Sequence, residues 1–416
     1  MKFDDYNIRE ELKRGIRKMG LKRPTDIQYK AIPNILNGED VLAIAQTGTG
    51  KTAAFAIPIL SLLAKRKRRE RALGIRAVVM APTHELAEQI GKVFEELSRY
   101  MDIKTLCVYG GVDQDPQIQK LQKGVDVIVA TPGRLFDLSS QGYIDLRKCE
   151  ILTLDEADQM LDLGFLEDIR QLIRILPNKR QTLFFSATID ARIKKLAYSL
   201  VHNPIRIQIS PKDPVSKNVD HSVMFVEMDE KRFFLERIFK DKQGAKILAF
   251  VRTKVRAERV VKAMKRADIE ALCIHGDMEQ ADRQKALNAF RSGEVKLLIA
   301  TDVSARGIDI AGVEIVINYD LPENPENYVH RVGRTGRGKN RGTALSFCSS
   351  GEKDLLVAIE DYIYKPIDRI ELEKKDHQLT LDTAEGNQRF LKDMMDEIEQ
   401  IKDFTRKKNK TKKIKK

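Results

Sequence analysis

A glycine-rich segment early in the chain has the residue types needed to hold a row of phosphates. Ala45-Gln-Thr-Gly-Thr-Gly-Lys-Thr52 follows a predicted strand and precedes a predicted helix. Glycine at 48 and 50 lets backbone N–H groups turn toward phosphate oxygens, Lys51 supplies a positive charge, and the Thr52 hydroxyl can ligate Mg²⁺. The usual pattern has a further glycine where this chain has Ala45. The segment predicts a nucleoside triphosphate site formed by Thr47, Gly48, Thr49, Gly50, Lys51 and Thr52.

A second segment supplies acids suited to phosphate chemistry. Asp155-Glu-Ala-Asp158 comes directly after the apolar run Ile151–Leu154. Ligands collect at the carboxyl ends of parallel strands, so these acids are expected to face the phosphate loop. Asp155 suits the binding of Mg²⁺ through water, and Glu156 suits the orientation and deprotonation of an attacking water. Alone, the segment would be interpreted as a solvated acidic turn, but a strand and a phosphate loop together favour triphosphate hydrolysis.

The elements that must position these residues follow from the hydrophobic pattern. Short β-rich apolar runs alternate with amphipathic helical stretches, which predicts an α/β fold with mostly parallel sheets. The runs are Val41–Ala45, Ala77–Ala81, Lys104–Tyr109, Val125–Ala130, Ile151–Leu154, Gln181–Phe185, and then Lys246–Val251, Glu270–Ile274, Val295–Ala300, Val313–Asn318 and Gly342–Phe347. Two α/β domains are therefore expected.

The boundaries of these domains follow from composition. Residues 209–218 contain two prolines and several polar residues, which suits an extended linker. We therefore expect one domain over residues 1–208 and another over residues 219–370. Residues 371–416 are charged and weakly helical, which predicts a partly disordered tail.

Charge and apolar content limit the partners of the chain. The net charge of the 416 residues is +13, and residues 406–416 carry eight Lys or Arg and no acid, so without them it falls to +5. Such a balance favours a polyanionic partner. The longest near-apolar run, Ala53–Ala64, is too short to span a membrane, and the first residues lack a secretory pattern, so we expect a cytoplasmic protein with no membrane contact. Four distant cysteines indicate neither a disulfide framework nor a zinc site.

Further segments complete an ordered series from Phe3 to Arg337. They are Pro24–Gln28, Pro82–Ala87, Gly110-Gly111, Thr131–Arg134, Ser186–Thr188, Phe250–Thr253, His275–Asp277, Gln280 with Arg283, Ala300–Asp309 and His330–Arg337. With the phosphate loop and the acidic segment, they make the sequence resemble a DEAD-box RNA helicase of bacterial type with a short basic tail. The resemblance implies two tandem RecA-like domains, ATP and Mg²⁺ as cofactors, and ATP hydrolysis used to unwind short RNA duplexes or to remodel RNA–protein complexes.

The resemblance also assigns nucleotide contacts. Gln28 is implied to read the adenine edge with Phe3 nearby, and Asp309 is implied to meet the ribose. An amide can do this physically, since one donor and one acceptor match the N6/N7 edge of adenine. Arg334 and Arg337 are implied to act as arginine fingers on the γ-phosphate, where a planar guanidinium stabilises charge spread over phosphoryl oxygens. Lys51, Asp155 and Glu156 complete the implied catalytic set.

Contacts with RNA are implied mainly at phosphate and sugar, so binding should tolerate many sequences, with the 2′-OH separating RNA from DNA. The implied residues are Pro82, Thr83, His84, Gly110, Gly111, Thr131, Pro132, Arg134, Arg252, Thr253, Gly276, Asp277 and Thr301. Residues implied to couple hydrolysis to unwinding are Ser186, Thr188, Asp158 and His330. ATP and RNA together are expected to draw the two domains shut.

Two positions depart from the family pattern. Position 21 is Leu where an aromatic residue is usual, which predicts weaker adenine stacking. Position 84 is His where Arg is usual, and a neutral histidine cannot form a bidentate phosphate contact. A tolerated polar side chain at position 84 is an equal interpretation.

Two other functions remain open at this point. A DNA translocase could share the phosphate loop and acids, and an ATP-gated RNA clamp would bind without unwinding. Ribosomal or RNA-decay proteins are candidate partners, and a monomer is expected. Residues 406–416 are hypothesised to be a non-specific RNA tether, because eight positive charges without an acid cannot pack and should bind phosphates.

Overall fold

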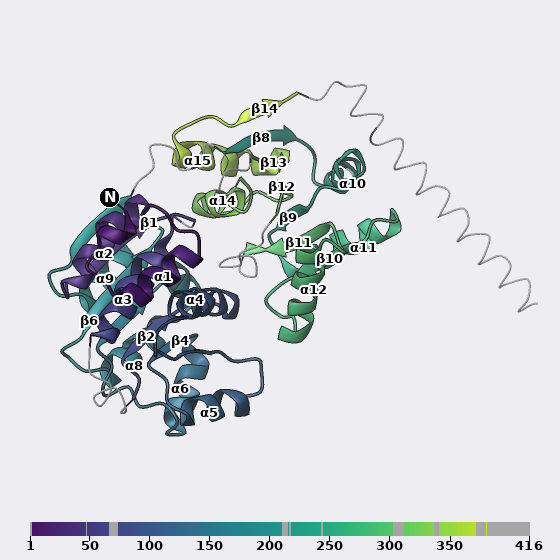
Figure 1. Ribbon diagram of the computed structural model, residues 1–416. Helices are drawn as coiled ribbons and strands as arrows, with labels where there is room; N and C mark the ends of the chain where they lie inside the picture. Colours follow the sequence, from purple (N-terminus) through teal and green to yellow (C-terminus); the bar gives the residue numbers. More distant parts are fainter. Residues whose placement is uncertain are drawn as a thin grey trace, which may run out of the picture. The chain divides into compact units, whose positions relative to one another are not determined.

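In the computed structural model, the chain forms two compact units (Figure 1). The structure describes residues 2–46, 48–65, 74–209, 215, 218–242, 244–302, 312–336, 341–371 and 380. Most described residues of the first unit lie in 2–209, with 278–284 also grouped with it, and most of the second unit lies in 218–277, 285–302 and 312–371. Most of the predicted linker, and nearly all of the predicted tail, lie outside the described residues.

The first unit is built on one parallel sheet. Its described residues give seven strands in the order β3-β4-β2-β5-β6-β1-β7. The strands are β1 (Val41–Ala45), β2 (Ala77–Met80), β3 (Thr105–Val108), β4 (Val127–Ala130), β5 (Ile151–Leu154), β6 (Gln181–Ser186) and β7 (Ile205–Ile209). The helices are η1 (Phe3–Asp5), α1 (Glu10–Lys18), α2 (Asp26–Leu36), α3 (Lys51–Ala64), α4 (His84–Leu97), α5 (Asp115–Gln122), α6 (Pro132–Ser140), α7 (Ala157–Asp162), α8 (Leu166–Ile175) and α9 (Ala191–Leu200).

Alternate side chains of the central strands enter two different cores. In β1, Val41 and Ala43 pack with apolar residues of α1, α2, α3 and α4, whereas Leu42 packs with those of α6, α8 and α9. Successive strand residues point to opposite faces, so a strand covered on both faces must be apolar throughout. This burial explains why the sequence predicted the inner strands from continuous apolar runs.

The second unit repeats the architecture. Its described strands form a parallel sheet in the order β10-β11-β9-β12-β13-β8-β14. The strands are β8 (Val219–Phe225), β9 (Ile247–Val251), β10 (Ala271–Ile274), β11 (Leu297–Thr301), β12 (Ile315–Asn318), β13 (Gly342–Cys348) and β14 (Asp368–Ile370). The helices of this part of the chain are α10 (Lys231–Asp241), α11 (Lys254–Arg266), α12 (Gln280–Ser292), α14 (Pro325–Val332), η2 (Ser350–Glu352) and α15 (Lys353–Ile363).

The hydrophobic pattern of the sequence did not predict three strands, β7, β8 and β14. They lie at or next to the ends of the two sheets, where at least one face or edge meets solvent. All three residues of β14 are exposed, and β7 buries only Ile207 fully. Polar residues interrupt these strands, so no apolar run marks them. Among the described residues, no helix is both long and apolar enough to cross a membrane.

Candidate functional site

The phosphate loop lies between β1 and helix α3. Gly48 and Gly50 have φ angles of 80° and 92°, in the left-handed region that favours glycine. Helix α3 begins at Lys51, whose ammonium donates to the carbonyl oxygen of Ala45 at 2.9 Å. The start of a 14-residue helix and the N–H groups of such glycines are groups that can bind an anion, and phosphate binding by this loop stays a prediction. Thr47, a predicted contact, lies outside the described residues.

Gln28 fastens helix α2 to this loop. Its Oε1 accepts from the backbone N–H of Thr25 at 3.0 Å, and its Nε2 donates to the carbonyl of Gly50 at 3.1 Å. The Thr25 hydroxyl adds a bond to the Thr49 carbonyl at 2.8 Å. Both hydrogen-bonding groups of the buried amide are therefore engaged within the protein. Adenine reading by Gln28 stays a prediction, and it would use the second N–H of Nε2 and the second lone pair of Oε1.

Phe3 is more deeply placed than the sequence indicated. Its ring is 3% exposed and lies 6.2 Å, centroid to centroid, from that of Tyr6. Leu21 packs partly buried against the same core. Phe3 and Leu21 thus belong to the core that also includes apolar residues of α2. A direct contact of Phe3 with adenine stays a prediction.

The acidic segment lies at the carboxyl end of β5, as predicted from the sequence. The buried carboxylate of Asp155 accepts the backbone N–H of Glu156 at 3.0 Å. Burial raises the pKa of Asp155, and the positive charge of Lys51 opposes that shift. Glu156 has a φ of 51°, an uncommon value for a residue with a side chain, and it precedes helix α7.

Asp158 joins the acidic segment to the end of β6. Its Oδ2 accepts from the backbone N–H groups of Ala187 and Thr188 at 2.9 and 3.1 Å, and from the Thr188 hydroxyl at 3.3 Å. Thr188 also donates its N–H to the Ser186 hydroxyl at 3.3 Å. Two predicted coupling segments are therefore in contact inside the first unit.

The residues present fit a magnesium ion bound chiefly by phosphate and water. Mg²⁺ uses one or two carboxylates plus substrate oxygens and water rather than a protein cage. Asp155 is a buried carboxylate whose charge burial disfavours, so a cation beside it would stabilise it. Thr52, at the start of α3, can supply a hydroxyl.

The predicted RNA residues of the first unit lie at the ends of three adjacent strands, β3, β4 and β2. Thr83 caps α4 by accepting the N–H of Leu86 at 3.3 Å, and Thr131 stands at the start of α6. Arg134 donates to the Val112 carbonyl at 2.9 Å, which fixes the loop after Gly110-Gly111. The predicted phosphate loop follows β1 and the predicted acids follow β5, while the predicted coupling residues Ser186 and Thr188 lie at the end of β6, which stands between those two strands. The carboxyl ends of the strands thus fall into two neighbouring halves. The RNA half consists of the ends of β3, β4 and β2, and the ATP half of the ends of β5, β6 and β1.

Tyr109 is a residue of this edge that the sequence analysis did not single out. The His84 ring stacks on it, with centroids 5.3 Å apart and an interplanar angle of 25°. The Tyr109 hydroxyl donates to the Glu88 carboxylate. Burial lowers the pKa of His84, so the imidazole is neutral at neutral pH. An aromatic residue at the end of the predicted run Lys104–Tyr109 was the available signal.

The second unit places its predicted RNA residues in the same way. Arg252 and Thr253 follow β9, Gly276 and Asp277 follow β10, and Thr301 ends β11. These strands are adjacent, in the order β10-β11-β9. Thr253 caps α11 by accepting the N–H of Arg256 at 3.2 Å, and Lys254 pairs with the Asp277 carboxylate.

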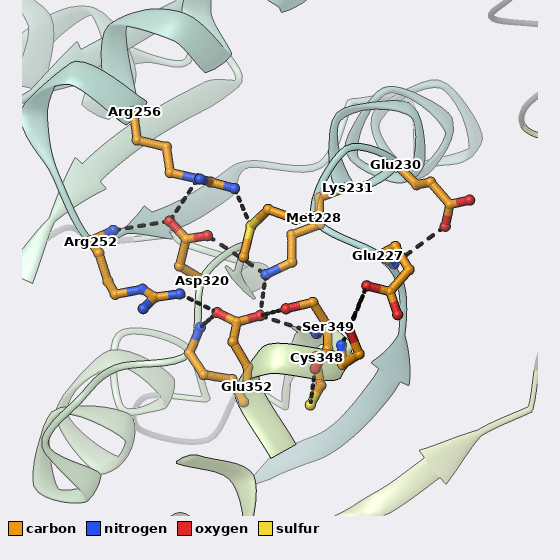
Figure 2. Close-up of polar contacts among 12 residues, drawn as sticks. Glu227, Met228, Glu230, Lys231, Arg252, Arg256, Asp320, Cys348, Ser349 and Glu352 are labelled. Atoms are coloured by element: carbon orange, nitrogen blue, oxygen red, sulfur yellow. Dashed lines mark hydrogen bonds and ion pairs between the residues drawn. The ribbon is translucent and has the colours of Figure 1, made fainter. Parts of the chain in front are cut away.

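Behind Arg252 lies a buried ionic network (Figure 2). Glu352 accepts from Arg252 at 2.7 Å and from the fully buried Lys231 at 2.5 Å, and Lys231 lies 3.6 Å from Asp320. Burial alone would raise the pKa of Glu352, but Lys231 and Ser349 outweigh it and the net shift is downward. The sequence around Lys231 and Glu352 resembles ordinary charged surface, so it held no signal for this network.

The segment His330–Arg337 places one unforeseen arginine in the core. Arg331 is 1% exposed and holds both carboxylate oxygens of Asp302, at 2.5 and 2.8 Å. Arg334, a predicted finger, donates its Nε to the His330 carbonyl at 3.2 Å. Arg337 and Asp309 lie outside the described residues.

The chain has two α/β units, each built on a parallel sheet, and the first has a phosphate loop and an acidic residue at the carboxyl end of a strand. These features define a RecA-like ATPase. Residues 25–196 match the DEAD/DEAH box helicase model, and residues 230–339 match the helicase conserved C-terminal domain model. The chain is 39% identical over 389 residues to the DEAD-box ATP-dependent RNA helicase CshA of Bacillus subtilis, covering 93% of this chain and 76% of the relative. It is 38% identical over 370 residues to RhpA of Helicobacter pylori, covering 89% and 74%.

Solved structures with a similar fold indicate the same family. The fold is similar to that of S. cerevisiae Dbp5 bound to RNA and ADP BeF3, with a TM-score of 0.81, 31% identity, and 91% and 98% coverage of the two chains. It is also similar to Mss116p bound to ssRNA and AMP-PNP, with a TM-score of 0.78, 26% identity, and 90% and 80% coverage. The chain belongs to the DEAD-box ATP-dependent RNA helicases. The predicted tandem RecA-like fold and the predicted RNA-stimulated ATPase and helicase activity are confirmed.

Proposed function

We propose that the two halves of the first unit's sheet edge divide the work of this helicase. The ends of β1, β5 and β6 hold and hydrolyse ATP with Mg²⁺, and the ends of β2, β3 and β4 hold the sugar-phosphate backbone of RNA. In the second unit the ends of β9, β10 and β11 hold RNA as well. The observation that carries this division is the strand order. The predicted RNA residues follow the neighbouring strands β3, β4 and β2, and the predicted phosphate loop, coupling residues and acids follow the neighbouring strands β1, β6 and β5.

In the ATP half, the N–H groups of Gly48–Thr52 would cradle the phosphates. Lys51 would exchange its bond to the Ala45 carbonyl for one to a phosphate oxygen. Thr52 and Asp155 would hold Mg²⁺, which supplies positive charge to the phosphate oxygens when bound. Glu156 would accept a proton from the water that attacks the γ-phosphorus, and the bond to the ADP oxygen would break.

Coupling to RNA would use the contact between Asp158 and Thr188. Arg334 and Arg337 would stabilise the transferring phosphoryl group, Asp309 would meet the ribose, and His330 would take part in the coupling; these roles rest on the family motif. Domain closure, a monomeric state, a cytoplasmic location, and ribosomal or RNA-decay partners stay predictions.

The experiment that tests the ATP half compares Glu156→Gln with Glu167→Gln, an exposed residue of α8. Glu156→Gln should bind ATP normally and lose about 10²–10⁴-fold in RNA-stimulated phosphate release, because the amide keeps the shape but cannot accept the proton. Glu167→Gln should match wild type. RNA should stimulate release more than DNA of the same sequence. Near wild-type release by Glu156→Gln would refute the role of Glu156.

A further inference from the structure

A basic groove lies in the second unit, between helices α10 and α11. Its cavity of about 380 Å³ is lined by four arginines, Arg232, Arg256, Arg259 and Arg266, and by one acid, Asp229. Valine and alanine side chains of α11 contribute an apolar floor. Four guanidinium groups against one carboxylate give the groove a strong preference for anions.

Three of these arginines keep their charge available. Arg256 is already neutralised by Asp320, at 3.0 Å, and also contacts the Met228 sulfur (Figure 2). Arg232, Arg259 and Arg266 form no ion pair with any residue in the described part of the chain. The Nε of Arg232 is buried and has no hydrogen-bond partner among those residues. Arg256 is thus held by Asp320. Arg232 packs on the Phe233 ring at 4.4 Å and Arg266 donates its Nε to the Lys262 carbonyl at 3.3 Å, contacts that leave the positive charge of each guanidinium unpaired among the residues that the structure describes.

The groove begins where the predicted RNA track of this unit ends. Thr253, which follows β9 and caps α11, is also one of the residues that line the groove. Arg256, Arg259 and Arg266 recur at three- and seven-residue steps, which puts them on one face of α11. At 1.5 Å per residue, the stretch from Arg256 to Arg266 covers about 15 Å. A strand leaving Thr253 therefore passes the paired Arg256 and then meets the positive charges of Arg259 and Arg266 on the same face of α11.

We infer that this groove is a second RNA-binding surface, which holds phosphates of the strand beyond the strand-end track. The inference rests on the proposed RNA track at Arg252 and Thr253. Guanidinium groups bind phosphate through paired N–H donors and stack on bases, and the apolar floor suits ribose and base faces. An acidic peptide would satisfy the same charge, but it would not need continuity with Thr253.

The test uses the full chain with Arg259→Glu and Arg266→Glu combined. Its matched control reverses two exposed lysines of α9 in the first unit, Lys194→Glu and Lys195→Glu. Affinity is measured for a short single-stranded RNA that fills only the track, and for the same RNA extended at either end. Thermal unfolding checks that each variant folds.

Wild type and control should bind one extended RNA more tightly than the short one. The α11 variant should lose that gain, about tenfold, and its slope of log affinity against log salt should flatten by about 1.4 for two lost phosphate contacts. Its affinity for the short RNA should match that of the control. Equal binding of extended RNA by both variants overturns the inference, and polyglutamate binding lost only in the α11 variant would then mark a peptide site. Failure of wild type to bind the short RNA would instead refute the proposed track.

Discussion

The carboxylate of Asp158 and the side chain and backbone of Thr188 are joined by two hydrogen bonds, at 3.3 and 3.1 Å. These residues follow two neighbouring strands, β5 and β6, and are 30 positions apart in sequence. A shift of the acidic segment must therefore move the Ser186–Thr188 segment or break these bonds.

Thr188→Val tests this link because it removes only the hydroxyl bond. A hydrogen bond to a charged group contributes about 1.5–3 kcal/mol, so duplex unwinding per ATP hydrolysed should fall about tenfold or more. RNA-stimulated hydrolysis itself should stay within about threefold. Thr188→Ser keeps the hydroxyl and should behave as wild type. Equal losses of hydrolysis and unwinding in Thr188→Val would contradict a coupling role.

The close approach of Gln28 to the phosphate loop is tested by a pair of glycine substitutions. A Cβ at Gly50 would lie 2.5 Å from the Gln28 Nε2, whereas a Cβ at Gly38 would meet nothing within 4 Å. Both residues have positive φ, so Gly38→Ala carries the backbone cost of about 1 kcal/mol without the clash. Gly50→Ala should weaken ATP binding at least tenfold, and Gly38→Ala should leave it unchanged. Titration with a fluorescent ATP analogue measures both, and equal affinities would show that the contact is not needed.

The network around Lys231 makes a prediction for stability. Lys231→Met removes the fully buried cation between Glu352 and Asp320, which then keep only the partly exposed Arg252 and Arg256, and this should cost about 3–5 kcal/mol in urea unfolding of the full chain. Lys231→Met combined with Glu352→Gln should cost less than the sum of the single changes. A fully additive double variant would argue against a coupled network.

The same network predicts a pH dependence. The pKa of Glu352 is lowered in the folded state, so its contribution is complete above the ordinary glutamate pKa of about 4.3 and is lost as pH falls below it. Acid unfolding of Glu352→Gln should therefore depend less steeply on pH in that window. Glu323→Gln, an exposed control, should keep the wild-type slope.

His84 offers a gain-of-function test. The neutral ring stacked on Tyr109 provides no charge to phosphate, so His84→Arg should tighten RNA binding about three- to tenfold and steepen the salt slope by about 0.7. His84→Gln, polar and uncharged, should give no gain. The test is RNA affinity measured over a salt series. An unchanged slope of log affinity against log salt in His84→Arg would show that position 84 lies away from the RNA backbone.

The sequence alone determined the chemistry that depends on neighbours along the chain. The phosphate loop needs a strand, two glycines and a helix in succession, and Asp155 and Glu156 need only a buried strand before them. Apolar runs marked the strands that are buried on both faces, because such a strand excludes polar residues. Where one face or edge of a strand meets solvent, as in β7, β8 and β14, polar residues are allowed, and the hydrophobic pattern did not predict the strand.

Only the tertiary structure decided which distant residues meet. The strand order places Thr131 between Thr83 and Gly110, and no spacing in the chain encodes that order. Gln28 bonds to Gly50 across 22 positions, and Lys231 pairs with Glu352 across 121. A charged residue has the same identity in a solvated loop and in a buried ion pair. Which environment it occupies depends on the packing of segments far apart in the chain, because long-range burial, and not local spacing, sets the cost of leaving a charge without a partner.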